Sequence, residues 1–155
     1  LTSLVGSEMC IRDRAFAIHR DQLAARRDGY DPYVATRLNG GSDILAADYI
    51  AMHRERDATC AAVQPVTRPF DALLLPTSPC VPPKIAPLDT TEALMKASAR
   101  VLRNTALSNY LDRPTITIPC HRAGEAPVGL SLMGSRHHDR RLLAIAAGVE
   151  GIVRG

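Results

Sequence analysis

Residues 70–134 contain three short apolar runs, and each run ends at a proline or a glycine. The runs cover residues 72–75, 115–118 and 128–133, and they stop at Pro76, Pro119 and Gly134. Short apolar runs closed by such breakers are typical of buried β-strands. The loops that follow lie at the tips of the strands, where binding sites are often built. This stretch therefore predicts a β-sheet whose loops are candidates for a site.

Helical periodicity fills most of the remaining chain, because apolar side chains recur at spacings of three and four. We expect helices from about residue 15 onward and over residues 33–38, 43–64, 90–111 and 139–153. Ser42 or Asp43 is expected to cap the helix over 43–64, and Pro65 is expected to end it. Thr90 and Thr91 open the next helix.

Strands alternating with helices indicate the α/β class, with a mixed β-sheet flanked by helices. The run over 72–75 is apolar throughout, which predicts a strand covered on both faces in the centre of the sheet. The run over 128–133 is expected to return beside 115–118 as its antiparallel neighbour.

Composition excludes several classes of protein. The chain has 155 residues with a net charge of +3, and both signs are interspersed, which argues against a nucleic-acid partner. No apolar run approaches the roughly 20 residues of a membrane span, so we expect no membrane association and a cytoplasmic location. The four cysteines lack C-x-x-C spacing, and Cys120-His121 with His137-His138 is the one candidate metal site. Adjacent residues on a strand point to opposite faces, so Cys120 and His121 are poorly placed to chelate together. We therefore expect no metal and no cofactor.

The order of three longer motifs is more specific than any one of them. FDALLLPTSP, RNTALSNYLDRPTITIP and APVGLSLMG follow one another from Phe70 to Gly134. In this order the chain resembles the C-terminal part of the amidase signature family, related to the A subunit of glutamyl-tRNA amidotransferase. The resemblance implies the C-terminal portion of the amidase signature fold over residues 15–155, as a single incomplete domain. Residues 1–14 show no sustained period and are expected to be a non-family, artefactual leader, with a native flexible terminus as the alternative.

The resemblance also implies a mechanism. These enzymes hydrolyse amides with a Ser-Ser-Lys triad whose lysine and serine-rich loop lie upstream of the part matched here. The two lysines of this chain, Lys84 and Lys96, lack a serine-flanked setting, and a Cys-His pair built on Cys80 or Cys120 has no glycine-lined context. We expect no catalytic residue in this chain, and the chain alone is expected to be inactive.

Substrate-pocket residues are expected in three places. The loop after residues 72–75 walls the pocket in the family, and a T-x-x-x-N match lies in the helix beneath it. In the transamidase branch an arginine holds a substrate carboxylate, and a match lies in ATRLNGG. The candidates are Arg37, Thr77, Ser78, Arg103, Thr105 and Asn109. Structural roles are an equal or stronger alternative for Arg37, for the loop hydroxyls as turn caps, and for the helix residues as anchors to loop backbone.

Three functions remain open. The first is a fragment of an amidase that acts on a small-molecule amide, with a homodimer considered for the full-length enzyme. The second is an A-subunit-like part of a tRNA-dependent amidotransferase, against which Leu102 counts, because that branch has an acid at this position. The third is a non-catalytic binding domain that uses the loops after its strands.

Overall fold

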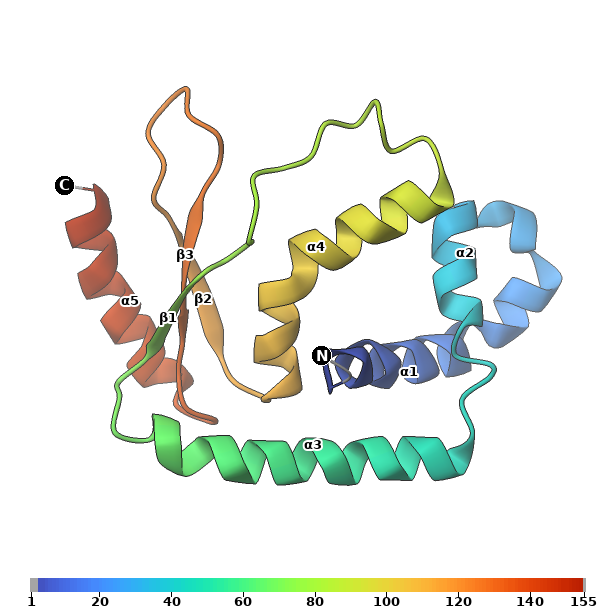
Figure 1. Ribbon diagram of the computed structural model, residues 1–155, viewed down its shortest axis with the longest axis horizontal. Helices are drawn as coiled ribbons and strands as arrows, with labels where there is room; N and C mark the ends of the chain where they lie inside the picture. Colours follow the sequence, from blue (N-terminus) through green and yellow to red (C-terminus); the bar gives the residue numbers. More distant parts are fainter. Residues whose placement is uncertain (1–2, 155) are drawn as a thin grey trace. The chain divides into compact units, whose positions relative to one another are not determined.

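The computed structural model describes residues 3–154, with side chains for residues 14–153 (Figure 1). It divides into two compact units, Leu1–Ala58 and Thr59–Gly155. The elements are, in chain order, α1 (Ser3–Ala25), the 3-10 helix η1 (Arg27–Gly29), α2 (Pro32–Asn39), α3 (Ala46–Thr67), β1 (Leu73–Pro76), α4 (Thr91–Tyr110), β2 (Thr115–Pro119), β3 (Gly129–Met133) and α5 (Asp139–Arg154).

The first unit is helical. Asp31 starts α2, because its Oδ1 accepts hydrogen bonds from the amides of Tyr33 and Val34 at 2.9 and 3.1 Å. Pro32 follows at the first helical position, where a missing N–H costs nothing. The expected helix over 33–38 is confirmed. Helix α1 begins at Ser3, so it includes most of the segment 1–14 that the fold prediction left out.

Two expectations for the ends of α3 are wrong. Ser42 Oγ donates to the carbonyl of Asn39 at 2.7 Å, and α3 begins only at Ala46, so neither Ser42 nor Asp43 caps it. At the other end the helix passes Pro65 and ends at Thr67. Pro65 lies in the last turn, where its ring removes a single backbone hydrogen bond. Thr67 Oγ1 donates to the Val63 carbonyl at 2.9 Å, which satisfies a carbonyl in that turn.

The second unit contains a three-stranded sheet in the order β1-β3-β2. Both pairings are antiparallel, with Leu74 opposite Leu132 and Ile116 opposite the same leucine. The α/β class is confirmed, and 115–118 and 128–133 are the antiparallel neighbours that their sequence predicted. The strands of the described chain do not form the mixed pattern that was expected, because neither pairing is parallel.

The position of residues 72–75 is a further correction. The strand β1 lies at an edge of the sheet, and β3 occupies the centre. Leu73 and Leu75 are half-buried on one face, whereas Leu74 is 64% exposed on the other. A continuous apolar run therefore shows that both faces of the strand are hydrophobic, but it does not show whether the strand lies at the centre or at the edge of the sheet.

The core of the second unit has a layer on each face of the sheet (Figure 1). Helix α5 covers one face, where Leu142 and Ala146 pack with Ile118 and Leu132. On the other face Tyr110 and Leu111, at the end of α4, pack against Met133, with residues 60, 63, 73 and 75 around them. Leu132 and Met133 are each only 1% exposed, so the central strand is buried on both sides.

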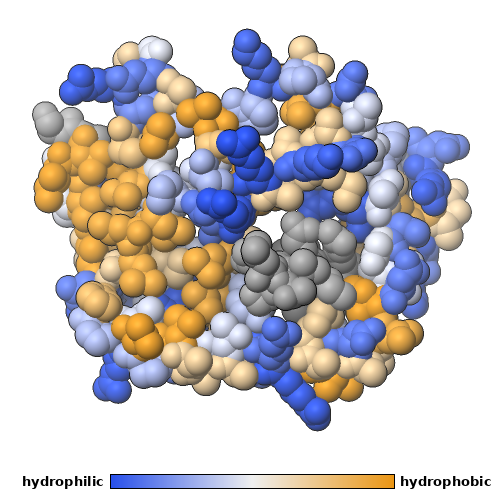
Figure 2. Space-filling view, in the orientation of Figure 1, coloured by the Kyte–Doolittle hydropathy of each residue, from blue (hydrophilic) through white to orange (hydrophobic). Residues whose placement is uncertain are grey.

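The outer side of this unit keeps a large apolar area. Figure 2 shows apolar residues gathered over the region of α5 and the sheet. In the same elements, Leu74 of β1 and Leu143 and Ile152 of α5 are exposed to 64%, 58% and 82%. Such a contiguous area on a small protein is typical of a surface that another segment covers. Within the residues described, no helix is both long enough and apolar enough to cross a membrane.

Candidate functional site

The strands β1 and β2 end at the same side of the sheet, because both run antiparallel to β3. Pro76 lies opposite Leu130, and Pro119 lies opposite Gly129. The loops over residues 77–90 and 120–128 therefore both leave the sheet at the start of β3. The predicted residues Thr77 and Ser78 lie at this end.

Three hydroxyl groups meet on one face of the sheet at this point. Thr77 Oγ1 lies 2.7 Å from Ser131 Oγ and 3.2 Å from Thr117 Oγ1, and the last two atoms are 3.1 Å apart. The three distances are all within hydrogen-bonding range. We call this group the hydroxyl ring. It joins the loop after β1 to the two other strands.

Gly129 makes the hydroxyl ring sterically feasible. A Cβ at this position would lie 2.7 Å from both Thr77 Oγ1 and Thr117 Cγ2. The Gly129 carbonyl also accepts a hydrogen bond from the Thr77 amide at 2.8 Å. The absence of a side chain at Gly129 therefore lets the threonines approach each other across β3.

The sequence-based prediction did not include Thr117 and Ser131. Thr117 and Thr115 alternate with isoleucines in β2, so the two threonines share one face of the strand. Ser131 interrupts the apolar run of β3 and is only 2% exposed. A polar residue inside an apolar strand, opposite a strand with alternating threonines, was the signal available in the sequence.

Helix α4 holds the start of the loop in place. Asn104 Nδ2 donates to the Pro76 carbonyl at 2.7 Å, and Ser78 Oγ donates to the Val101 carbonyl at 3.3 Å. Ser78 thus has an anchoring hydrogen bond in the structure. The anchoring residue on the helix is Asn104, which the sequence-based prediction missed although it lies between two of its candidates.

The remaining helix candidates are arranged differently. Thr105 Oγ1 donates to the Leu102 carbonyl of its own helix at 3.0 Å, which is a common use of a helical threonine. Arg103 and Asn109 are exposed on α4. The loop-anchoring role expected for Thr105 is instead performed by its neighbour Asn104, and a role in substrate binding stays a prediction for all three.

Arg37 belongs to the first unit and has partners within its own helix. Its guanidinium lies over the ring of Tyr33, with Cζ 5.7 Å from the ring centroid. Its Nη1 donates to the Tyr33 hydroxyl at 3.5 Å. These contacts orient a half-buried arginine along α2. Its role toward a substrate carboxylate stays a prediction.

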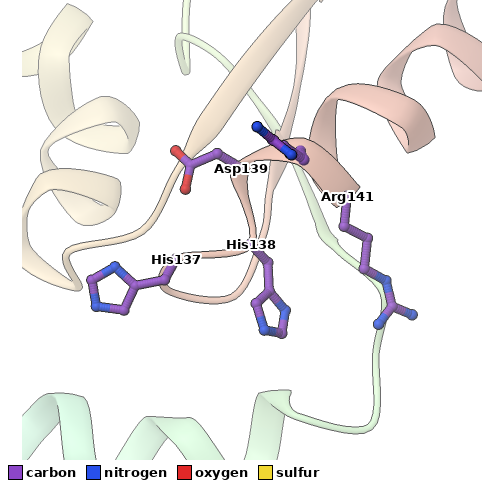
Figure 3. Close-up of a pocket in the computed structure, with 5 residues that line it drawn as sticks. His137, His138, Asp139 and Arg141 are labelled. Atoms are coloured by element: carbon purple, nitrogen blue, oxygen red, sulfur yellow. The ribbon is translucent and has the colours of Figure 1, made fainter.

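A hollow lies at the start of α5 (Figure 3). It has a volume of about 600 Å³ and is lined by the consecutive residues His137, His138, Asp139, Arg140 and Arg141. All five are exposed, and Arg141 is paired with Asp71. In Figure 3 the Asp139 carboxylate points away from the imidazole of His138, so the groups do not converge on one point. This hollow lacks the arrangement of an acid, a base and a nucleophile that amide hydrolysis requires.

The residues discussed as metal ligands are also dispersed. His121 Nδ1 lies 3.2 Å from both the carbonyl oxygen and the amide nitrogen of Val128, so its ring contacts the β2–β3 connection. Among the described residues, no three histidine, cysteine or acidic side chains are grouped in a way that would hold a metal ion.

Comparisons with known proteins show the family to which the chain belongs. The sequence profile of the amidase family matches residues 8–143. The 2-amino-5-chloromuconic acid deaminase of Comamonas testosteroni is 32% identical over 124 residues, which are 79% of this chain and 27% of the relative. The A subunit of the glutamyl-tRNA(Gln) amidotransferase from Sulfurisphaera tokodaii is 32% identical over 140 residues, with shares of 86% and 29%.

The fold agrees with the sequence comparisons. A solved amidase structure superposes with a TM-score of 0.75 at 26% identity, and the match covers 93% of this chain and 34% of that one. The chain thus spans less than a third of the length of the two relatives named above. It covers part of an amidase domain, and it belongs to the amidase family, the amidase signature enzymes that its sequence resembles.

Proposed function

We propose that this chain is the part of an amidase that supplies sheet core and substrate-pocket walls. The enzyme would hydrolyse a carboxylic amide to an acid and ammonia or an amine, through a Ser-Ser-Lys triad outside residues 15–155. The observation that carries the proposal is the profile match over residues 8–143 in a chain that spans less than a third of its relatives. The hydroxyl ring and the anchored loop after β1 form one wall of the pocket in this proposal.

The lysines of this chain support the assignment of catalysis to another segment. A lysine general base needs burial to lose its proton near neutral pH. Lys96 Nζ lies 2.7 Å from Glu92 Oε1, and both side chains are more than 70% exposed. Lys84 is exposed in the loop over residues 77–90. Both lysines are exposed, so neither has the buried setting of a lysine general base, and we expect the isolated chain to be inactive.

The amidotransferase alternative has one observation for it and one against it. The relative named as part of an amidotransferase is as similar in sequence as the relative named as a deaminase. Leu102, however, is an apolar side chain, 42% exposed, at the position where the resemblance places an acid. A leucine provides no carboxylate for a substrate amino group, so an amidase with a less polar pocket is favoured. One relative is named as a deaminase of an amino-substituted acid, so acids of this kind should also be tested as substrates.

The test compares two proteins side by side. One is this chain, and the other is the protein that the complete native reading frame encodes. Each is incubated with aliphatic and aromatic primary amides, with an amino-substituted unsaturated acid and with glutamine, and released ammonia is measured by a glutamate-dehydrogenase-coupled assay. We expect ammonia from the primary amides with the encoded protein and none with the chain alone.

Other outcomes decide between the alternatives. Release from glutamine that depends on a charged tRNA would favour the amidotransferase. Release from the chain alone would overturn the assignment of the nucleophile to another segment. An encoded protein that binds primary amides and releases no ammonia from any substrate would favour the non-catalytic binding domain.

A further inference from the structure

The hydroxyl ring has an unusual balance of hydrogen-bond donors and acceptors. Each threonine or serine hydroxyl has one proton and two lone pairs. Three mutual contacts at 2.7, 3.1 and 3.2 Å use all three protons and leave one lone pair on each oxygen. The closed ring therefore offers acceptors and no donors, and it has no net charge.

The ring is also accessible from one side. Ser131 is 2% exposed and forms its base, Thr77 is half-buried, and Thr117 is exposed. The free lone pairs of the two threonines can thus be reached from the sheet end where the loops over 77–90 and 120–128 leave. The missing side chain of Gly129 keeps this position open, because a Cβ would lie 2.7 Å from both threonines.

A fourth hydroxyl lies on the helix that contacts this end of the sheet. Ser108 Oγ is buried and has no hydrogen-bond partner among the described residues. Ser108 follows Asn104 by one helical turn, so it lies on the side of α4 that is fixed to Pro76. Buried polar atoms without a hydrogen-bond partner are rare in folded proteins, so each one needs an explanation. The side of α4 that faces β1 therefore carries one more hydroxyl group, that of Ser108, in addition to the three hydroxyls of the ring.

We propose that the Thr77–Thr117–Ser131 hydroxyl ring is an uncharged acceptor subsite that binds the N–H group of a primary carboxamide substrate. The inference rests on the proposed function and adds the group that recognises the amide nitrogen. An N–H donor matches the free lone pairs of the two accessible threonines, whereas a carboxylate offers only acceptors of its own and finds no donor in the ring. The three residues are binding residues, and the subsite selects amides over acids and over fully substituted amides.

The test uses the protein that the native reading frame encodes. Binding of propionamide and of N,N-dimethylpropionamide, which lacks an N–H, is measured by saturation-transfer difference NMR. We expect Thr117→Val to weaken propionamide binding about tenfold, the loss of one neutral hydrogen bond, and to leave the dimethyl amide within about twofold. Thr117→Ser keeps the hydroxyl and restores the affinity. Thr115→Val is the matched control on the same face of β2, and it leaves both affinities unchanged.

Each result has a defined meaning. Equal weakening of both amides by Thr117→Val would show a structural effect and overturn the subsite, and so would unchanged binding of propionamide. Loss of propionamide binding that is selective for N–H supports the subsite, whether or not the protein releases ammonia. Selective binding without ammonia release overturns the proposed function and leaves the subsite intact, so the two failures are distinguishable.

Discussion

Gly129→Ala is the change that tests the packing around the hydroxyl ring most directly. The new methyl group would lie 2.7 Å from Thr117 Cγ2 and from Thr77 Oγ1, well inside van der Waals contact. Thr117 is β-branched and has little freedom at χ1, so it cannot rotate away easily. Thr77 can move only by breaking its contacts with Ser131 and Thr117. The strands must separate, or the ring must open.

The expected loss of stability follows from these contacts. Overpacking costs about 1–3 kcal/mol, and each broken neutral hydrogen bond costs about 0.5–1.5 kcal/mol. Replacement of glycine by alanine returns about 0.4–1 kcal/mol, because it restricts the unfolded chain. We expect Gly129→Ala to lower the free energy of unfolding by about 2 kcal/mol.

Urea unfolding of the protein that the native reading frame encodes, followed by far-UV circular dichroism, measures this difference. Gly148→Ala is the control, since it lies in α5 and its Cβ would meet nothing within 4 Å. Alanine is the better helix former, so the control should gain up to about 1 kcal/mol. A Gly129→Ala protein within about 0.5 kcal/mol of the parent, with an unchanged urea dependence, would refute the packing argument.

Two further substitutions and one dye-binding measurement test other parts of the fold. Thr90→Ala removes the hydroxyl that accepts a hydrogen bond from the Ala93 amide at 3.2 Å, so it should lower the free energy of unfolding by about 1 kcal/mol in the same urea assay. Its control, Thr91→Ala, should lower it by only a few tenths of a kcal/mol. Equal effects of the two substitutions would contradict the capping role of Thr90. Asn104→Ala removes the donor to the Pro76 carbonyl, so it should lower the free energy of unfolding by about 1 kcal/mol and speed proteolysis of the loop over 77–90. Arg100→Ala, at an exposed position of the same helix, is its control. Since Leu74 and Ile152 are 64% and 82% exposed, the chain alone should bind the dye ANS strongly and aggregate, and a protein with little ANS fluorescence would speak against an uncovered apolar face.

Local signals in the sequence were sufficient for most elements. Asp31-Pro32 and Thr90 each provide a helix start that depends only on neighbouring residues, and both helices begin there. Pro65 shows the limit of such rules, because α3 passes it and ends at Thr67, and a proline in the last turn removes only one backbone hydrogen bond. The order of the motifs also identified the family, since the spacing of several runs along a chain is a property of the sequence itself.

The hydroxyl ring forms only in the tertiary structure. Thr77 is 40 residues from Thr117 and 54 residues from Ser131 along the chain, and no local pattern relates them. The position of β1 at the edge of the sheet also depends on the tertiary structure, because an apolar run does not specify which strand lies beside it. Periodicity is a property of consecutive residues, so the sequence determined the helices and strands. Strand order and register depend on contacts between distant residues, and only folding brings those hydroxyls together.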